Sequence, residues 1–320
     1  MSQPLTSVTL LAKLRDSNPE VRQLALTEMD DAGGFDFVEP LIEATRDVDP
    51  TVRRLAIGLL EEVGDPRSIA ALIVALDDEV DAVREAAIAA VREFRDPSAV
   101  TSLLAAVRHP SASVRRWVIV ALRGTPDPRA LALFIEALDD PEAEVRREAV
   151  IAVAHAKRPE SVGSLRRRLH DYDAAVRRLA VGALAYFNGP RLLRDFAVAT
   201  ADDDWQVRRE AAIVLGRLQS VAAVPVLLPL LSDSYWQVEK EAAVSLGRLG
   251  AVDAVPALIA RLGSERADLR KTAAEALGEL EAEAARGPLA ALLSDADADV
   301  RKAAEASLLR IRKGTAVHDA

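Results

Sequence analysis

A 31-residue period runs through the chain and constrains its fold more than any other feature. A valine, replaced once by leucine, recurs at this interval ten times without an insertion, at Val21, Val52, Val83, Val114, Val145, Val176, Val207, Val238, Leu269 and Val300. We number the repeats 1 to 10 from these positions and describe other residues by their offset from them. Such a period is typical of solenoid proteins, in which each repeat packs against its neighbours.

Each repeat valine begins the apolar stripe of a predicted helix. Apolar residues follow at offsets of 4, 8 and 11, for example Ala211 and Leu215 after Val207, and this spacing places them on one face of an α-helix. A second apolar column, eleven residues before the valine, predicts a shorter helix such as Ile69 to Leu76. We call the shorter helix A and the longer one helix B.

Polar residues and prolines mark where these helices begin and bend. A polar residue three positions before the valine suits the N-cap of helix B in six repeats, as Asn18, Asp49, Ser111, Asp173, Asp204 and Asp297. Pro229 lies inside helix A of repeat 8 and predicts a kink. We expect an all-α protein, a right-handed α-solenoid of ten αα-hairpins. The predicted repeats cover residues 3–33, 34–64, 65–95, 96–126, 127–157, 158–188, 189–219, 220–250, 251–281 and 282–312 of one domain, 1–320, with a tail at 313–320.

Two charged columns accompany helix B. Arginine directly follows the repeat valine in nine of ten repeats, Glu239 being the exception. Aspartate stands five residues before the valine in eight of ten, the exceptions being His109 and Ser264. A functional site would be local, whereas these columns are uniform. We therefore predict a structural role, in which each arginine bonds the aspartate and the loop carbonyls of the adjacent repeat.

Composition excludes several classes of protein. The 320 residues include no cysteine, which excludes disulfides, thiolate metal sites and cysteine nucleophiles. No apolar run approaches the roughly 18 residues that cross a bilayer, and the N-terminus lacks the features of a signal peptide. The 41 basic and 50 acidic residues give a net charge of -9, which disfavours a general role on nucleic acid or membranes. We expect a soluble, cytoplasmic monomer.

The stretches Asp202–Leu218 and Asp233–Leu249 carry a pattern close to D-x-[DN]-P-x-V-R-x-x-A-A-x-A-L-G. This pattern resembles the HEAT-like repeats that are grouped with phycobilin lyases, and the resemblance covers residues 3–312. It implies that helix B lines a concave face. It says little about function, because such repeats serve enzymes, lyases and binding proteins alike.

Residues at offsets 2, 3, 6 and 10 lie off the buried stripe and point to one side of helix B. Eight of ten residues at offset 2 are basic, which favours an acidic partner. Repeats 4 to 7 add apolar and aromatic residues, a composition typical of binding sites. The predicted groove contains Arg116, Trp117, Val120, Arg147, Ile151, His155, Arg178, Leu179, Tyr186, Arg209, Ile213 and Arg217.

A second contact patch is predicted at the start of helix B in repeats 7 and 8. Trp205 and Trp236 occupy the same column, two residues before the valine, in consecutive repeats. Tyr235 adjoins Trp236, and Glu239 breaks the arginine column nearby. The alternative is that these aromatic residues only cover the turn between helices A and B.

Little in the sequence points to catalysis. A di-iron hydroxylase built on such repeats would carry His-Glu pairs at offsets 2 and 3, where this chain has Arg147-Glu148, Arg209-Glu210 and Lys240-Glu241. Cations at those positions would repel a metal ion. There is no phosphate-binding loop, nucleophile elbow or zinc motif. We expect no cofactor, no metal and no catalytic residue.

The sequence therefore favours a non-catalytic scaffold that binds a protein or peptide with acidic and apolar groups in its concave groove. One alternative is a tetrapyrrole-binding lyase or chaperone similar to the phycobilin lyases, in which the basic column would hold propionates. A second alternative is a HEAT-like nucleic-acid-binding protein, favoured by the basic column but disfavoured by the net charge. If the chain is an enzyme, the lyase is the activity we expect.

Overall fold

The computed structural model describes residues 7–31, 37–94, 96–125, 127–187 and 192–318. Within these ranges the chain forms twenty α-helices and no strand. Short and long helices alternate, which confirms the predicted all-α solenoid of αα-hairpins. By contact the chain divides into two compact units, Met1–Ala156 (unit 1) and Lys157–Ala320 (unit 2). The single solenoid domain over residues 1–320 stays a prediction.

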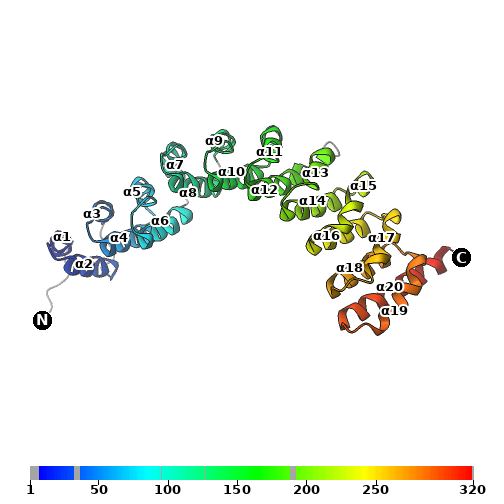
Figure 1. Ribbon diagram of the computed structural model, residues 1–320. Coiled ribbons are helices and arrows are strands. Elements are labelled where there is room, and N and C mark those ends of the chain that lie inside the picture. Colours follow the sequence, from blue (N-terminus) through cyan, green and yellow to red (C-terminus); the bar gives the residue numbers. More distant parts are fainter. Residues whose placement is uncertain (1–6, 32–36, 95, 126, 188–191, 319–320) are drawn as a thin grey trace. The chain divides into compact units, whose positions relative to one another are not determined.

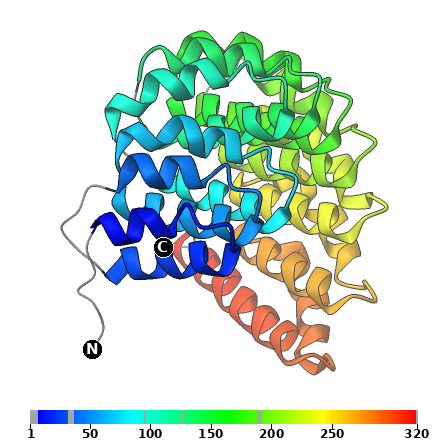
Figure 2. The ribbon, with the colours of Figure 1, turned by 90° about the vertical axis from the view of Figure 1, so that its left-hand side faces the viewer.

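Unit 1 contains the first five hairpins. They pair α1 (Ser7–Lys13) with α2 (Pro19–Asp31), α3 (Val38–Ala44) with α4 (Pro50–Val63), α5 (Ile69–Ala75) with α6 (Asp81–Glu93), α7 (Val100–Ala106) with α8 (Ala112–Arg123), and α9 (Ala130–Ala137) with α10 (Ala143–Ala156). The odd-numbered A helices lie in one row and the even-numbered B helices in another (Figure 1). Figure 2 shows these hairpins stacked in chain order, from blue to green.

Unit 2 repeats the arrangement in five further hairpins. They pair α11 (Val162–Arg168) with α12 (Ala174–Leu184), α13 (Leu193–Ala199) with α14 (Trp205–Arg217), α15 (Val224–Leu227) with α16 (Trp236–Arg248), α17 (Val255–Arg261) with α18 (Ala267–Glu279), and α19 (Arg286–Ala291) with α20 (Ala298–His318). The 3-10 helices of the two units are η1 (Pro66–Ser68), η2 (Pro97–Ala99), η3 (Pro159–Ser161), η4 (Ala185–Phe187), η6 (Val221–Ala223), η7 (Leu228–Ser232), η8 (Val252–Ala254), η9 (Glu283–Ala285) and η10 (Leu292–Ser294).

The core follows the predicted stripe of helix B. The small residue at offset 4 is fully buried in all ten repeats, because neighbouring helices close over it from both sides. At Pro229 the structure differs from the predicted kink: the α-helix α15 already stops at Leu227, and the chain continues through Pro229 as the 3-10 helix η7, because proline cannot donate the backbone hydrogen bond of a helix interior. The helix α20 extends to His318, and so it includes most of the segment predicted as a tail.

Most of the predicted N-caps form. The carboxylates of Asp49, Asp173, Asp204 and Asp297 each accept a hydrogen bond from backbone N–H groups of the first helical turn, and Asn18 does the same through its amide oxygen. The prediction for Ser111 is wrong. Its hydroxyl makes no cap and instead donates to Asp77 at 2.6 Å, because that carboxylate from the preceding hairpin lies within reach.

The arginine and aspartate columns form a ladder within each unit. Six arginines bond, through Nε and Nη2, both carboxylate oxygens of the aspartate in the next hairpin, as Arg22–Asp47, Arg53–Asp78, Arg115–Asp140, Arg177–Asp202, Arg208–Asp233 and Arg270–Asp295. One expected detail was wrong. Nη1 of Arg22 donates to the carbonyls of Asp16 and Ser17 in its own turn, not in the adjacent repeat, because the guanidinium reaches back over that turn.

The ladder is interrupted once in each unit. In unit 1, His109 replaces the aspartate that Arg84 would meet, and Arg84 pairs instead with Asp81 of its own helix. We call each Arg–Asp pair of the ladder a rung. In unit 2, Glu239 replaces the arginine and Ser264 the aspartate of one rung. Glu239 is buried and pairs with Arg261 of α17 at 3.2 Å. At this exchanged rung the acidic side chain comes from helix B, and the basic one comes from helix A of the next hairpin.

Candidate functional site

The twelve residues of the predicted groove divide between the two units. Six lie on α8 and α10 of unit 1, and six belong to α12, η4 and α14 of unit 2. In both units these side chains occupy the part of helix B that hairpin stacking leaves open to solvent, and none is fully buried. A groove that continues from one unit to the other stays a prediction.

In unit 1 the predicted site centres on Trp117 of α8. The Arg116 guanidinium lies 4.7 Å from the centre of the Trp117 ring, in a cation–π contact, and the indole is half-buried. Val120 and Ile151, at offset 6 of successive B helices, are also half-buried. His155 is exposed near the end of α10. Unit 1 therefore presents an aromatic and aliphatic surface that the repeat itself does not require.

Charges around Trp117 are largely paired. Arg116 bonds Glu144 at 2.9 Å and lies 4.0 Å from Glu148, and Arg123 bonds Glu148 at 3.2 Å. Sequence reasoning missed Glu144 and Arg123 as members of this network. Their positions are predictable only once the two B helices are known to lie side by side, because each contact joins different repeats.

In unit 2 the most accessible predicted residue is Tyr186 of η4. Its side chain is 67% exposed, and Lys157 Nζ lies 5.6 Å from the ring centre. Leu179 and Ile213 are half-buried nearby in α12 and α14. Arg209 pairs with Glu241 at 2.9 Å, whereas Arg217 is exposed. Unit 2 thus combines an exposed aromatic ring, aliphatic side chains and several cations.

The predicted second patch contains a stack of aromatic rings in unit 2. The rings of Trp205 and Tyr235 lie 5.5 Å apart and nearly parallel, at 10°. Arg208 lies 5.7 Å from the Tyr235 ring, and Arg266 lies 5.4 Å from the Trp236 ring. Three aromatic side chains therefore extend from one turn to the next along this edge.

Glu239, the fourth predicted member of that patch, does not belong to the exposed surface. It is only 8% exposed and faces the ladder. Burial raises the pKa of Glu239 above its usual value, and the nearby Arg261 only partly offsets this effect. The sequence showed that Glu239 was unusual, but the direction of its side chain depends on the packing of α17.

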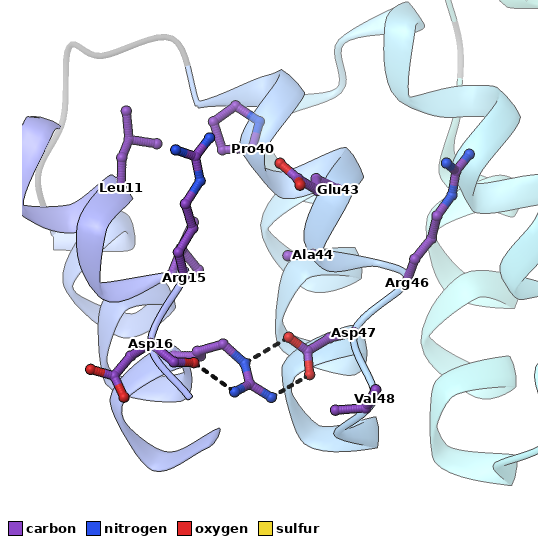
Figure 3. Close-up of a pocket in the computed structure, with 11 residues that line it drawn as sticks. Leu11, Arg15, Asp16, Pro40, Glu43, Ala44, Arg46, Asp47 and Val48 are labelled. Carbon is purple, nitrogen blue, oxygen red and sulfur yellow. Dashed lines mark hydrogen bonds and ion pairs between the residues drawn. The ribbon is translucent and has the colours of Figure 1, made fainter. Parts of the chain in front are cut away.

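Two cavities lie away from the predicted groove residues. In unit 1 a cavity of about 550 Å³ between the first two hairpins is lined by residues such as Leu11, Arg15, Pro40, Glu43 and Arg46 (Figure 3). In unit 2 a cavity of about 390 Å³ is lined by Lys271, Glu275, Asp299, Lys302 and Arg310. Both cavities are open and combine charged with apolar residues, and neither brings a nucleophile and a base together.

Among the described residues, no three histidine, aspartate or glutamate side chains gather as metal ligands. Across those ranges there is also no helix long and apolar enough to cross a membrane.

The stacked αα-hairpins define an α-solenoid. HEAT-repeat profiles match residues 7–92, 69–144, 131–197, 194–275 and 225–310, so the chain belongs to the HEAT-repeat family. The narrower resemblance to the repeats grouped with phycobilin lyases is not confirmed by these matches. No curated protein matches the chain significantly.

Solved structures support the fold. An engineered protein is 21% identical, with a TM-score of 0.54 over 95% of this chain and 98% of its own. YibA of Escherichia coli is 19% identical, with a TM-score of 0.63 over 78% of this chain and 97% of its own. A chain from a structure of Kap95p bound to RanGDP is 11% identical, with a TM-score of 0.65, and covers 96% of this chain but 48% of its own. At these identities the similarity concerns the fold alone.

Proposed function

We propose that the chain is a non-catalytic HEAT-repeat scaffold that binds a protein or peptide partner on the solvent-facing side of its B helices. One observation carries this proposal. Trp117, Ile151 and Tyr186 remain partly or largely exposed at offsets where the repeat does not need an apolar residue. Large apolar side chains exposed beside arginines are typical of the residues that dominate protein interfaces.

The partner that fits this surface carries both apolar and acidic groups. Arg178 and Arg217 lie beside the apolar side chains of unit 2, and neither takes part in an ion pair among the described residues. The fold is also compatible with this role, since Kap95p, whose structure is similar, binds RanGDP. Shape similarity does not identify a partner, so the proposal depends on the surface residues.

The tetrapyrrole alternative is less well supported. Holding both propionates would require free cations at neighbouring offset-2 positions, but Glu241 engages Arg209, the neighbour of the unpaired Arg178, and Glu144 engages Arg116. An absorbance titration of the purified chain with bilin or haem tests this alternative. A saturable spectral shift would favour it over protein binding.

The test of the proposed function is a capture experiment from the native host. Trp117→Ala removes the aromatic centre of the unit 1 surface, so proteins captured by the intact chain are lost. The matched control is Tyr172→Ala, which removes a fully exposed aromatic ring outside both predicted surfaces. Capture that is unchanged by Trp117→Ala, with both variants folded by circular dichroism, contradicts the assignment.

A further inference from the structure

Side chains at offset 2 form a second set of contacts between neighbouring hairpins. In unit 1, Gln23 bonds Asp49 at 3.1 Å and Arg116 bonds Glu144 at 2.9 Å. In unit 2, Arg209 bonds Glu241 at 2.9 Å and Lys271 lies 3.9 Å from Asp299. In each case a polar or basic side chain reaches an acidic side chain of the next hairpin.

Arg178 of α12 departs from this pattern although its acidic neighbour is present. Glu210 stands at offset 3 of the next B helix, α14, which is the position that Glu241 holds relative to Arg209. In the described part of the chain, however, no ion pair joins Arg178 to Glu210, and the buried Nε of Arg178 has no hydrogen-bond partner. Arg178 is therefore a cation that the fold itself leaves unpaired.

Gly182 explains why the pair is open. The corresponding residue beside Arg209 and Glu241 is Ile213, whose side chain fills the space at offset 6. A Cβ atom at Gly182 would lie 3.2 Å from Glu210 Oε1 and 3.8 Å from its Cδ. The Glu210 carboxylate thus lies over Gly182, at the offset where repeats 4, 5, 7 and 8 have valine or isoleucine, and it does not reach Arg178.

The surroundings of this open pair are apolar and positively charged. Leu179 and Ile213 are half-buried on α12 and α14, which pack side by side, and Tyr186 is 67% exposed on the same face. Lys157 lies against the Tyr186 ring, and Arg217 is exposed at the end of α14. The surface thus carries three cations, Arg178, Lys157 and Arg217, and the carboxylate of Glu210, and this excess of positive charge complements an acidic ligand.

We propose that the α12–α14 surface, made of Arg178, Leu179, Gly182, Tyr186, Glu210 and Ile213, binds an acidic peptide segment of a partner protein. A carboxylate of the segment pairs with Arg178, and a neighbouring apolar side chain covers Leu179, Ile213 and the Tyr186 ring. This inference rests on the proposed function and specifies one site and the chemistry of its ligand.

The glycine makes the proposal testable without removing a charged residue. Gly182→Val introduces the residue that offset 6 carries in repeats 4 and 8, as Val120 and Val244. The new side chain displaces Glu210 toward Arg178, where the two pair as Arg209 and Glu241 do. The variant should therefore leave Arg178 paired and unavailable to a ligand. The substitution should not disturb the helix, because valine occurs at offset 6 in other repeats.

The experiment selects random peptides displayed on phage against the intact chain and measures the affinity of the enriched sequences by calorimetry. We expect enriched peptides with aspartate or glutamate beside a leucine, isoleucine, valine or aromatic residue. Their affinity falls at least tenfold on Gly182→Val and on Arg178→Ala. It is unchanged on Gly58→Val, the matched control at offset 6 in unit 1, where a Cβ atom meets nothing within 4 Å.

Several outcomes overturn the proposal. Enrichment of basic or uncharged peptides, no enrichment, or an affinity that Gly182→Val leaves unchanged would each do so. Tighter binding of a single-stranded DNA oligonucleotide, or self-association that Gly182→Val abolishes, would assign the surface to a different occupant. Peptides lost on Trp117→Ala but not on Gly182→Val would leave the broader function standing and reject only this site. A crystal structure of Gly182→Val that lacks an Arg178–Glu210 ion pair would also contradict the mechanism.

Discussion

Neighbouring B helices approach each other differently in the two units. At offset 9, three successive B helices of unit 2 carry glycine, whereas the second to fourth B helices of unit 1 carry charged residues. The glycines are Gly216, Gly247 and Gly278, and the charged residues are Glu61, Arg92 and Arg123. The same 31-residue repeat therefore serves two kinds of helix contact.

In unit 2 the glycines bring backbones close together. A Cβ atom at Gly216 would lie 2.5 Å from the Cβ of Ser245 and 2.9 Å from its Cα. Because no side chain shields the carbonyl of Ala212, four residues earlier, the buried Ser245 hydroxyl donates to it at 2.8 Å. Ser307 donates to Ala274 beside Gly278 in the same way.

In unit 1 the residues at offset 9 have long charged side chains, which do not let the backbones of neighbouring B helices approach as closely as glycine does. Arg123 reaches Glu148 of the next B helix at 3.2 Å. Contacts through long charged side chains tolerate a shift of one helix against the other, whereas contacts through backbone atoms do not. The B-helix contacts of unit 2 therefore depend on small residues at offset 9, and those of unit 1 do not, whereas both units contain three intact rungs of the ladder.

The largest effect should come from the ladder. Arg208→Ala leaves the Asp233 carboxylate without its partner, and the two side chains are only 12% and 7% exposed. We expect a loss of about 3 kcal/mol or more in the free energy of unfolding, because an unpaired buried charge is costly. Arg84→Ala, at the interrupted rung of unit 1, should cost less than about 1 kcal/mol because Asp81 is largely exposed. Urea denaturation measures the loss of unfolding free energy in both variants. Equal losses would contradict the expectation that an intact rung contributes more than the interrupted one.

A smaller effect is expected at the glycine contacts. Gly216→Ala places a methyl group against the backbone of Ser245 and should destabilise unit 2 by about 1–3 kcal/mol, despite the better helix propensity of alanine. Gly58→Ala in α4 meets open space and should stabilise unit 1 by about 0.5–1 kcal/mol. Hydrogen exchange of the α14, α16 and α4 amides separates the two responses. Stabilisation by both changes would show that the α14–α16 spacing can relax.

The smallest effect concerns how the free energy of unfolding depends on pH. This dependence should differ between the intact Arg208–Asp233 rung and the exchanged Glu239–Arg261 rung. Burial would raise the pKa of Asp233, but hydrogen bonds from Arg208 and the Tyr235 N–H lower it below its usual value. Its stabilising contribution is present above the unfolded pKa of about 4 and is lost as the pH falls below it. The pKa of Glu239 is raised, so its contribution is present at low pH and is lost as the pH rises through the raised pKa.

Two amide variants measure this difference. The stability advantage of the unaltered chain over Asp233→Asn should grow as the pH rises from about 3 to 5. Its advantage over Glu239→Gln should shrink as the pH rises from about 4. Urea titrations at a series of pH values measure the two slopes, and both changes should be smaller than the effects of the ladder and glycine variants. Slopes of the same sign would disprove the exchanged-rung interpretation.

Much of the fold was predictable from the sequence because the repeat encodes it locally. The valine at offset 0 and the alanine at offset 4 define the buried stripe, and Asp49 and Asp204 cap their helices. The partners of the ladder were also predictable, since a contact repeated with the same period can be inferred once for all repeats. The candidate surface residues on α8, α10, α12 and α14 could be chosen because helical geometry places their offsets outside the stripe.

The sequence by itself thus determined the hairpins, their order and the residues that each B helix turns toward solvent. Only the tertiary structure decided which charges are paired there. Arg209 and Arg178 stand at the same offset, and each has a glutamate at offset 3 of the next B helix. Arg209 nevertheless bonds Glu241, whereas Glu210 lies over Gly182 and leaves Arg178 without an ion pair. The physical reason is that the rotamer of a long side chain depends on the space between two hairpins, here the space between Gly182 of one B helix and Glu210 of the next.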